Sequence, residues 1–530
     1  MVRRTGGWLA ALLTLTACSG GGGVRPVALP APAVTPETTR RLAVDESARE
    51  PAVLPVLGAV EGTTDGTSPT AEGPLRFAEV MVAVERSFPL VLAALEEVEI
   101  AEAEVLAAEG GFDLRVRGGL DSSLQGYYES DSASLGLEQP TTLWGATLFG
   151  GYKYGEGDFP VWEGGRKTRT GGEVRAGVRV PLLAGRSIDP RRAALWKARI
   201  QRAAADPKVL ARRLDATREA ALVYWGWVAA GQRLDIAERL LELARTRQAG
   251  IEESVDAGQF APIALVENRR LIVERESIAL RAERDLRQAA IRLSLFWRGA
   301  DGAPRVPSRA DLPGLLPSPR DPASILRDED LGLALARRPE VQLGRLALET
   351  MDVELARREN DVLPRVDVAV AGSQDLGAAT ADPDDKGPFE FDAFLDVELP
   401  LQRRSARGAL DAGRARRRQM ERELTLAEDR VAAEVRDVRL RLEVSWARLE
   451  RVRENARLAA TLEEAERAEL AEGTSDLLRV NLREQQTAAA ASMLVDAVAE
   501  HFRGLAEYRA VLGVPYGAGP LPDPRTSPAP

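Results

Sequence analysis

The sequence contains a helical stretch that is too long for a globular domain. From about Ala406 to Ala471 there is no proline, and Ala, Arg, Glu and Leu, which favour helix, dominate. A helix of that length spans ~100 Å at about 1.5 Å of rise per residue. A second helical pattern runs from about Arg191 to Ser254. We expect a kink or a break in it at Pro207, because proline cannot donate a helical hydrogen bond.

Small and apolar residues inside the longer stretch recur alternately four and three positions apart. This spacing is the heptad seam of helices that supercoil side by side. The seam consists of Val431, Val435, Val438, Leu442, Ser445, Leu449, Val452, Ala456 and Ala459. Taken alone, it would also fit a solvated coiled-coil rod.

Four segments, 112–120, 173–182, 365–370 and 389–399, alternate instead between apolar and charged residues. A period of two predicts strands with one apolar and one charged face. A soluble sandwich alternates in the same way, but nine of the 26 aromatic residues lie within 112–162. Aromatic girdles mark the level at which a membrane β-barrel crosses the lipid–water interfaces, so we favour a membrane wall.

The charged positions of these segments are expected to line the lumen of that barrel. They are Asp113, Arg115, Arg117, Glu173, Arg175, Arg179, Arg365, Asp367, Glu390, Asp392, Asp396 and Glu398. Seven acids against five bases could make the lumen selective for cations, or they could form cross-strand pairs that only solvate the wall.

Two hairpins give four strands per chain, whereas a closed membrane barrel needs about eight. The chain must therefore oligomerise, with 8 strands from a dimer or 12 from a trimer. A further strand-like run, 143–154, is assigned to an extended extracellular hairpin or loop. No run of 18 consecutive apolar residues occurs, so the sequence predicts no transmembrane helix.

The same series of signals occurs twice, which indicates an internal duplication. Each copy has a helix that opens at a proline, strand-like alternation, a second proline and a long helix. A tryptophan follows that second proline by 46 residues in both copies, Trp227 after Pro181 and Trp446 after Pro400. The copies differ mainly between their two prolines, a span of 92 residues in the first copy and 61 in the second.

The duplication sets the expected boundaries. The first structural repeat covers 75–300, the second covers 324–514, and 301–323, with six prolines, links them. Residues 1–17 have the pattern of a signal peptide, 18–74 of a flexible lipidated leader, and 515–530 of a disordered tail.

The N-terminus points to the bacterial envelope. Arg3 and Arg4 precede a short apolar core, and the run ends Leu15-Thr16-Ala17-Cys18. This resembles the lipobox of bacterial lipoproteins, in which cleavage leaves the cysteine as a lipidated N-terminus. The alternative is an ordinary secretory signal in which Cys18 is incidental.

Composition and motifs exclude several classes. One Cys and one His cannot form a disulfide framework or a His- or Cys-rich metal site. A net charge of −10 disfavours nucleic acid as a partner. No GxSxG, HExxH, Walker A or dinucleotide-binding glycine motif is present. We therefore expect no enzymatic activity, no metal, and no cofactor besides the lipid on Cys18.

Taken in order, these features resemble the TolC-like outer-membrane efflux protein family. The resemblance covers about residues 75–514 and includes RRPEV (337–341), VELPLQRRSARG (397–408), EGTSDLL (472–478) and EYRAVLG (507–513). It implies a mainly α fold with a membrane β-barrel part. In the family, three chains with four strands each form a 12-stranded barrel that continues into an α-helical coiled-coil barrel. The longer first hairpin region and Pro207 depart from the family pattern.

The resemblance also implies the function. The protein would be a homotrimer in the cell outer membrane, with its helical tunnel in the periplasm and its barrel in contact with outer-membrane lipid. It would be the passive exit duct of a tripartite efflux pump or type I secretion system, docked to a periplasmic adaptor protein and an inner-membrane transporter. Metals, drugs and proteins all pass through such ducts. The alternative is a coiled-coil outer-membrane lipoprotein that acts as a structural tether and has no pore.

Two glycine turns, with Gly258 and Gly473, are expected where the long helices reverse, at the periplasmic tip. In the family, acids just after the second turn line a constriction, and Asp476 matches the first of them. One helical turn further on, Arg479 replaces an acid. The pair could be a surface helix pair worth a few tenths of a kcal/mol, or Arg479 could bridge to Asp476 of a neighbouring chain and hold the tip closed.

Overall fold

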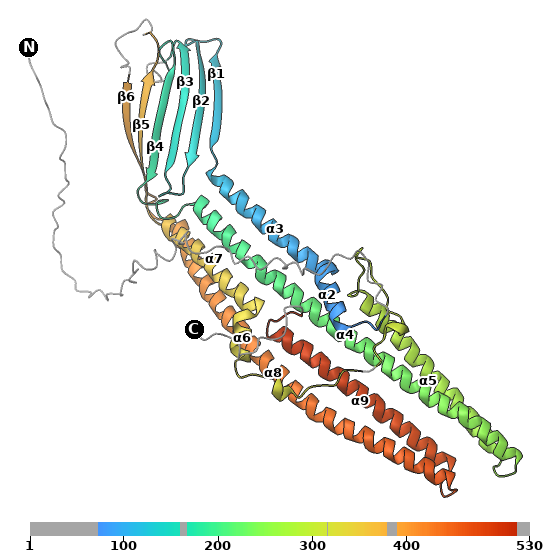
Figure 1. The fold of residues 1–530 in the computed structure, drawn as a ribbon. Helices are drawn as coiled ribbons and strands as arrows, with labels where there is room; N and C mark the ends of the chain where they lie inside the picture. Colours follow the sequence, from blue (N-terminus) through green and yellow to red (C-terminus); the bar gives the residue numbers. More distant parts are fainter. Residues whose placement is uncertain (1–72, 160–166, 315, 379–388, 517–530) are drawn as a thin grey trace, which may run out of the picture. The chain divides into compact units, whose positions relative to one another are not determined.

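The computed structural model describes residues 73–159, 167–314, 316–378 and 389–516. The N-terminal part of the chain, including Cys18, lies outside the described residues. The described residues fall within one compact unit, Glu72–Pro530. They form helices and one antiparallel sheet (Figure 1).

The first half of the chain contains α2 (Phe77–Ser87), α3 (Pro89–Glu109), η1 (Gly110–Phe112), α4 (Pro190–Asp256) and α5 (Ile263–Ser294). The second half contains α6 (Asp330–Arg337), α7 (Pro339–Asp361), α8 (Arg404–Ala471) and α9 (Leu477–Val511). The short helical turn η3 (Arg309–Asp311) lies in the predicted linker, and η4 (Pro322–Ser324) lies at its end. In both halves a short helix, a proline-started helix and a long helical hairpin follow one another.

Helix α4 is continuous over 67 residues and passes through Pro207. Of the kink or break expected at Pro207, the break is therefore wrong. Pro207 is buried, and α4 packs against α3, α7, α5 and α9 along its length. This packing offsets the cost of an interior proline, which is about 3 kcal/mol. Asp189, the residue before the helix, is its N-cap, because its Oδ1 accepts hydrogen bonds from the backbone N–H groups of Arg191 (2.8 Å) and Arg192 (3.1 Å).

The sheet has six strands, and each pairs antiparallel with the next in chain order. They are β1 (Arg115–Ser123), β2 (Ser130–Pro140), β3 (Thr147–Gly157), β4 (Glu173–Pro181), β5 (Arg365–Asp375) and β6 (Phe389–Glu398). Strands β1, β4, β5 and β6 join helices α3, α4, α7 and α8 at one end of the sheet, the helix end (Figure 1).

The predicted count of four strands per chain is wrong, because β2 and β3 complete a six-stranded sheet. The run 143–154 contains most of β3, which forms a hairpin with β2 and also pairs with β4. The run therefore belongs to the sheet and not to an extended hairpin or loop outside it. The sequence pattern missed β2 because its polar face carries Ser130, Ser132 and Ser134 in place of charged residues. Serine next to Ala and Gly gives little contrast with the apolar positions.

Among the described residues, the two largest of six hydrophobic clusters lie between the helices. The first surrounds Trp227, which is fully buried, and includes Tyr224, Trp225 and Phe77. The second surrounds Leu442 of the predicted heptad seam and includes Tyr508 of α9. Two tyrosine hydroxyls in these clusters donate hydrogen bonds: Tyr224 to the carbonyl of Leu75 (2.9 Å) and Tyr508 to Asp330 Oδ2 (2.8 Å).

Candidate functional site

The sheet gathers most of its charged side chains on one face. Its register places Arg115 opposite Glu138, Arg175 opposite Ser373, and Ser373 opposite Glu390. Because residues directly opposite each other share a face, the side chains of all predicted lumen residues within the strands lie on one face. Asp113 precedes β1 and lies outside the strands.

This charged face also holds residues that the sequence prediction omitted. Its members are the acids Asp121, Glu138, Glu173, Asp367, Asp375, Glu390, Asp392, Asp396 and Glu398 and the bases Arg115, Arg117, Lys153, Arg175, Arg179 and Arg365. Glu138 and Lys153 were missed together with β2 and β3, the strands that carry them.

Several of these charges are paired across strands. Lys153 Nζ lies 3.0 Å from Glu173 Oε2, and Arg175 Nη2 lies 3.2 Å from Asp392 Oδ2. Arg117 and Glu138 are 3.5 Å apart. On β6, by contrast, Glu390, Asp396 and Glu398 have no ion pair within the described part of the chain. The charged face is therefore partly neutralised, with unpaired acids concentrated on β6.

The opposite face is apolar and exposed. Leu120 is 89% exposed, and Phe391 and Leu395 of β6 are each 67% exposed. Polar residues on this face lie near the strand ends, such as Asp131 and Glu156. Such a sheet can contact lipid acyl chains on one face and water on the other. Among the described helices, none is both long and apolar enough to cross a bilayer.

Gly258 and Gly473 occupy the turns of the two helical hairpins, α4–α5 and α8–α9. Both have left-handed backbone conformations, with φ of +73° and +78°. Their N–H groups donate to the carbonyls of Val255 (2.9 Å) and Leu470 (3.0 Å), near the ends of the preceding helices. Glycine adopts this conformation without a Cβ clash, which explains its presence at both turns.

Asp476 and Arg479 lie at the start of α9. Asp476 Oδ1 accepts a hydrogen bond of 2.8 Å from the backbone N–H of Arg479, so Asp476 is the N-cap of this helix. Arg479 Nε lies 3.8 Å from Asp476 Oδ2, and both side chains are well exposed, at 63% for Asp476 and 65% for Arg479. Within one chain they form a surface pair.

A cluster of charges, here called the buried charge cluster, lies further along α9. It consists of the buried Glu484 and Arg275 together with Arg247 and the partly exposed Arg467. The side chain of Glu484 is 1% exposed, and its Oε2 lies 3.0 Å from Arg275 Nη2, whose side chain is 2% exposed. Glu484 also pairs with Arg247 of α4 and, at 3.2 Å, with Arg467 of α8. Burial lowers the pKa of Arg275. The cluster joins α4, α5, α8 and α9.

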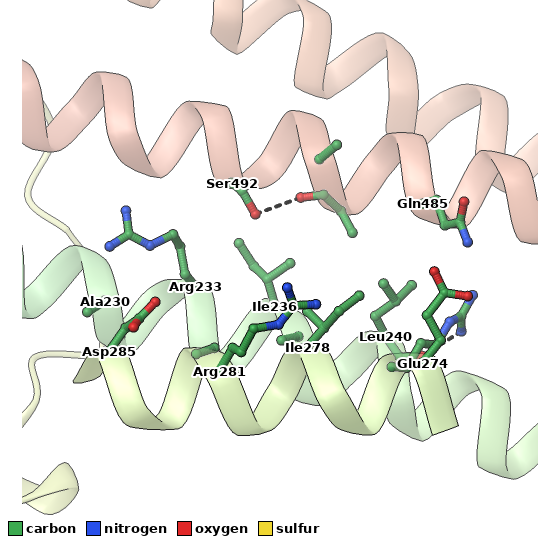
Figure 2. A pocket seen from close by; sticks show the side chains of 15 residues that line it. Ala230, Arg233, Ile236, Leu240, Glu274, Ile278, Arg281, Asp285, Gln485 and Ser492 are labelled. Carbon is green, nitrogen blue, oxygen red and sulfur yellow. Dashed lines mark hydrogen bonds between the residues drawn. The ribbon is translucent and has the colours of Figure 1, made fainter. Parts of the chain in front are cut away.

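Nothing in the sequence distinguishes the buried charge cluster from surface charges. Arg and Glu occur on most faces of these helices, and burial here depends on which hairpin packs against which. A pocket of about 560 Å³ adjoins the cluster, because Arg275 is one of its lining residues. Residues of α4, α5 and α9 line it, including Ile236, Ile278 and Ser492 (Figure 2). In the ranges that the structure covers, no group of three or more His, Cys, Asp or Glu side chains is placed to hold a metal ion.

Comparison with solved structures identifies the fold. The chain is similar to the Neisseria gonorrhoeae MtrE outer-membrane channel in its open state, with a TM-score of 0.58 and 14% identity over 84% of this chain and 94% of that one. It is also similar to the outer-membrane protein VceC of Vibrio cholerae (TM-score 0.57, 15% identity, 83% and 96% covered) and to the outer-membrane channel OprN (0.57, 15%, 82% and 89%). No protein-family model and no curated protein sequence matches the chain.

Proposed function

We propose, from the TolC-like fold that this chain shares with these outer-membrane channels, that it is the outer-membrane exit duct of a tripartite efflux pump or a type I secretion system. Three chains form a passive channel. Their sheets close into a barrel in the outer membrane, and their helices continue as a tunnel in the periplasm. The tips of the helical hairpins face a periplasmic adaptor protein and an inner-membrane transporter.

The observation that carries this proposal is the two-faced sheet at the end of the long helices. Its exposed apolar face would be unfavourable in water, because large apolar patches on soluble proteins are normally covered. Its charged face would be unfavourable in lipid. A closed wall with lipid outside and water inside satisfies both faces.

The duct would carry out no chemistry of its own, so no enzymatic activity is proposed. Lipidation of Cys18 would add an anchor to the barrel. We expect Cys18→Ser to abolish incorporation of a radioactive fatty acid and to slow outer-membrane assembly. Equal label in the variant and the wild type would contradict the lipoprotein assignment.

Conductance in planar lipid bilayers tests the duct directly. Purified wild-type protein should form trimers that resist detergent and should open ion-conducting channels. Trimers that assemble but conduct no ions would support the alternative, a structural tether without a pore.

A further inference from the structure

The β2–β3 hairpin runs the full height of the sheet. Every residue of β1 pairs with β2, from Arg115–Glu138 to Ser123–Ser130, and β2 pairs with β3 over all 11 of its residues. Strands of 9–11 residues match the length that a tilted strand needs to cross a membrane, about 9–11 residues. The hairpin therefore lies within the height of the sheet and does not project beyond one of its ends.

The turn between β2 and β3 is packed at the helix end. Gln139 Nε2 donates to the carbonyl of Phe112, just before β1, at 2.5 Å. The guanidinium of Arg186 lies over the Trp144 ring at 5.9 Å. A Cβ atom on Gly145, whose φ is +70°, would collide with the carbonyl oxygen of Gly185 before α4. The hairpin therefore spans from the helix end to the opposite end.

Both faces of the sheet continue across this hairpin. Leu135, Leu137 and Leu148 extend the apolar face and are 43–52% exposed. Glu138 and Lys153 extend the charged face and pair with Arg117 and Glu173 of the neighbouring strands β1 and β4. Strands β2 and β3 thus have the same two-faced pattern as the strands that join helices.

The two outer edges of the sheet are suited to each other. Within the described ranges, β1 has a strand partner only in β2, and β6 only in β5. β1 begins and β6 ends at the helix end, so β1 of one copy can pair antiparallel with β6 of another. At that end, β1 carries Arg115 and Arg117 while β6 carries Asp396 and Glu398, on the charged face.

From this geometry we propose that the β2–β3 hairpin is part of the membrane wall, so that the trimer closes an 18-stranded barrel through β1–β6 seams between copies. This rests on the proposed trimeric duct. Barrel diameter grows roughly linearly with strand number, so this wall is about 1.5-fold wider than one of 12 strands. The hairpin then sets the bore of the outer-membrane segment and admits larger hydrated solutes.

Cysteine cross-linking in the full chain tests the strand order. Leu120→Cys on β1 is combined with Val174→Cys, Ala176→Cys or Val178→Cys on the same face of β4. In the 18-stranded wall, two strands separate β1 from β4, a distance of about 14 Å, and no disulfide forms. If the hairpin lies outside the wall, β1 must pair directly with β4, and a cross-link within the chain would overturn the proposal.

The seam is tested with the same β1 position. Leu120→Cys combined with Phe391→Cys, Ala393→Cys or Leu395→Cys on the apolar face of β6 should give at least one cross-link between chains. Leu120→Cys with Asp392→Cys is the matched control, because these side chains lie on opposite faces. The single-cysteine variants report any cross-link to Cys18. If none of the three β1–β6 cysteine pairs gives a cross-link between chains, the proposed β1–β6 seam is contradicted.

A deletion variant tests the bore. Replacing residues 124–172 by Asn-Gly leaves four strands per chain. The replacement joins Ser123 to Glu173, which lie at the same end of the sheet and have their side chains on the same face. Neutral polymers of graded size are added to the extracellular side of a bilayer while conductance is measured. The largest polymer that lowers conductance should be smaller for the variant than for the wild type, and an equal cut-off would contradict the wider bore.

These results separate the two proposals. A wild type that forms no channel contradicts the duct. A conducting wild type with a β1–β4 cross-link contradicts only the 18-stranded wall. If the deletion variant does not assemble, the cysteine pairs in the full chain still decide between the two walls.

Discussion

At the scale of single residues, Asp476 has two roles, and a substitution by alanine would remove both at once. It carries a charge near the predicted constriction, and it caps α9 through the Arg479 N–H. Replacing an N-cap aspartate by alanine costs about 1 kcal/mol of helix stability, whereas asparagine caps equally well. Asp476→Asn therefore removes the charge and keeps the cap.

We expect Asp476→Asn and Arg479→Ala each to raise single-channel conductance, and the double variant to add little more. If Arg479 bridges to Asp476 of a neighbouring chain, both changes break that same link. Asp476→Ala serves as the comparison that also loses the cap. If neither single variant changes the conductance, the gate assignment fails, and the pair is only the surface pair seen within one chain.

His501 predicts a dependence of stability on pH. It is fully buried beside Trp446 and Phe502, neither ring nitrogen has a hydrogen-bond partner among the described residues, and burial lowers its pKa. The unfolded chain, with a histidine pKa of about 6.5, binds the proton more readily, so stability is lost as pH falls below about 6.5.

The unfolding temperature of the detergent-solubilised protein should therefore fall between about pH 7.5 and about pH 5.5. His501→Phe, which cannot titrate, should show a smaller decrease. Circular dichroism at several pH values measures both. Equal decreases in the two proteins would mean that other groups cause the pH dependence.

At the scale of elements, the glycine turns can be compared with a glycine inside a helix. Gly473 has a φ of +78°, whereas Gly250 lies within α4 with no atom near the position of a Cβ. A side chain in the left-handed conformation costs about 1–2 kcal/mol. Alanine in a helix interior is favoured over glycine by about 0.5–1 kcal/mol.

Gly473→Ala should accordingly lower the unfolding temperature, and Gly250→Ala should raise it. Thermal unfolding followed by circular dichroism gives the sign of each change. A stabilised Gly473→Ala variant would show that this turn does not need a left-handed residue.

Some of these elements could be predicted from the sequence and others could not. The ends of the two longest helices were predicted to within a few residues, because a helical period kept over so many residues has no other explanation, whereas the continuity of α4 through Pro207 was not predicted. Strand β2 was missed, since serine and glycine give little contrast between its faces. Burial of Glu484 by Arg247 and Arg275 could not be predicted, because it depends on contacts between helices more than 200 residues apart.

At the scale of the whole molecule, the acids of β6 predict ion selectivity. Asp392 is paired with Arg175, whereas Glu390, Asp396 and Glu398 are unpaired within the described chain. A trimer gathers three copies of each in one wall, and a surplus of fixed negative charge favours cations.

In a salt gradient the wild-type channel should therefore show a reversal potential of the sign for cation preference. Replacing Glu390, Asp396 and Glu398 by glutamine or asparagine should move that potential toward zero. Adding Asp392→Asn to these changes should leave Arg175 without its partner and should move the reversal potential further in the same direction. A potential that stays constant in the triple variant would favour the interpretation that the lumen charges are neutral as a set.

The packing of α4 also has a consequence for the order of biosynthesis. Helix α4 ends at Asp256, yet α9, which covers one of its sides, begins at Leu477. At about 5–20 residues per second, ribosomes need on the order of ten seconds or more to make the intervening chain. During that interval the side of α4 that carries Arg247 has no α9 against it. The charge of Arg247 keeps this side of α4 hydrated in the nascent chain. The free-energy cost of removing water from Arg247 arises only when Glu484 of α9 packs against it.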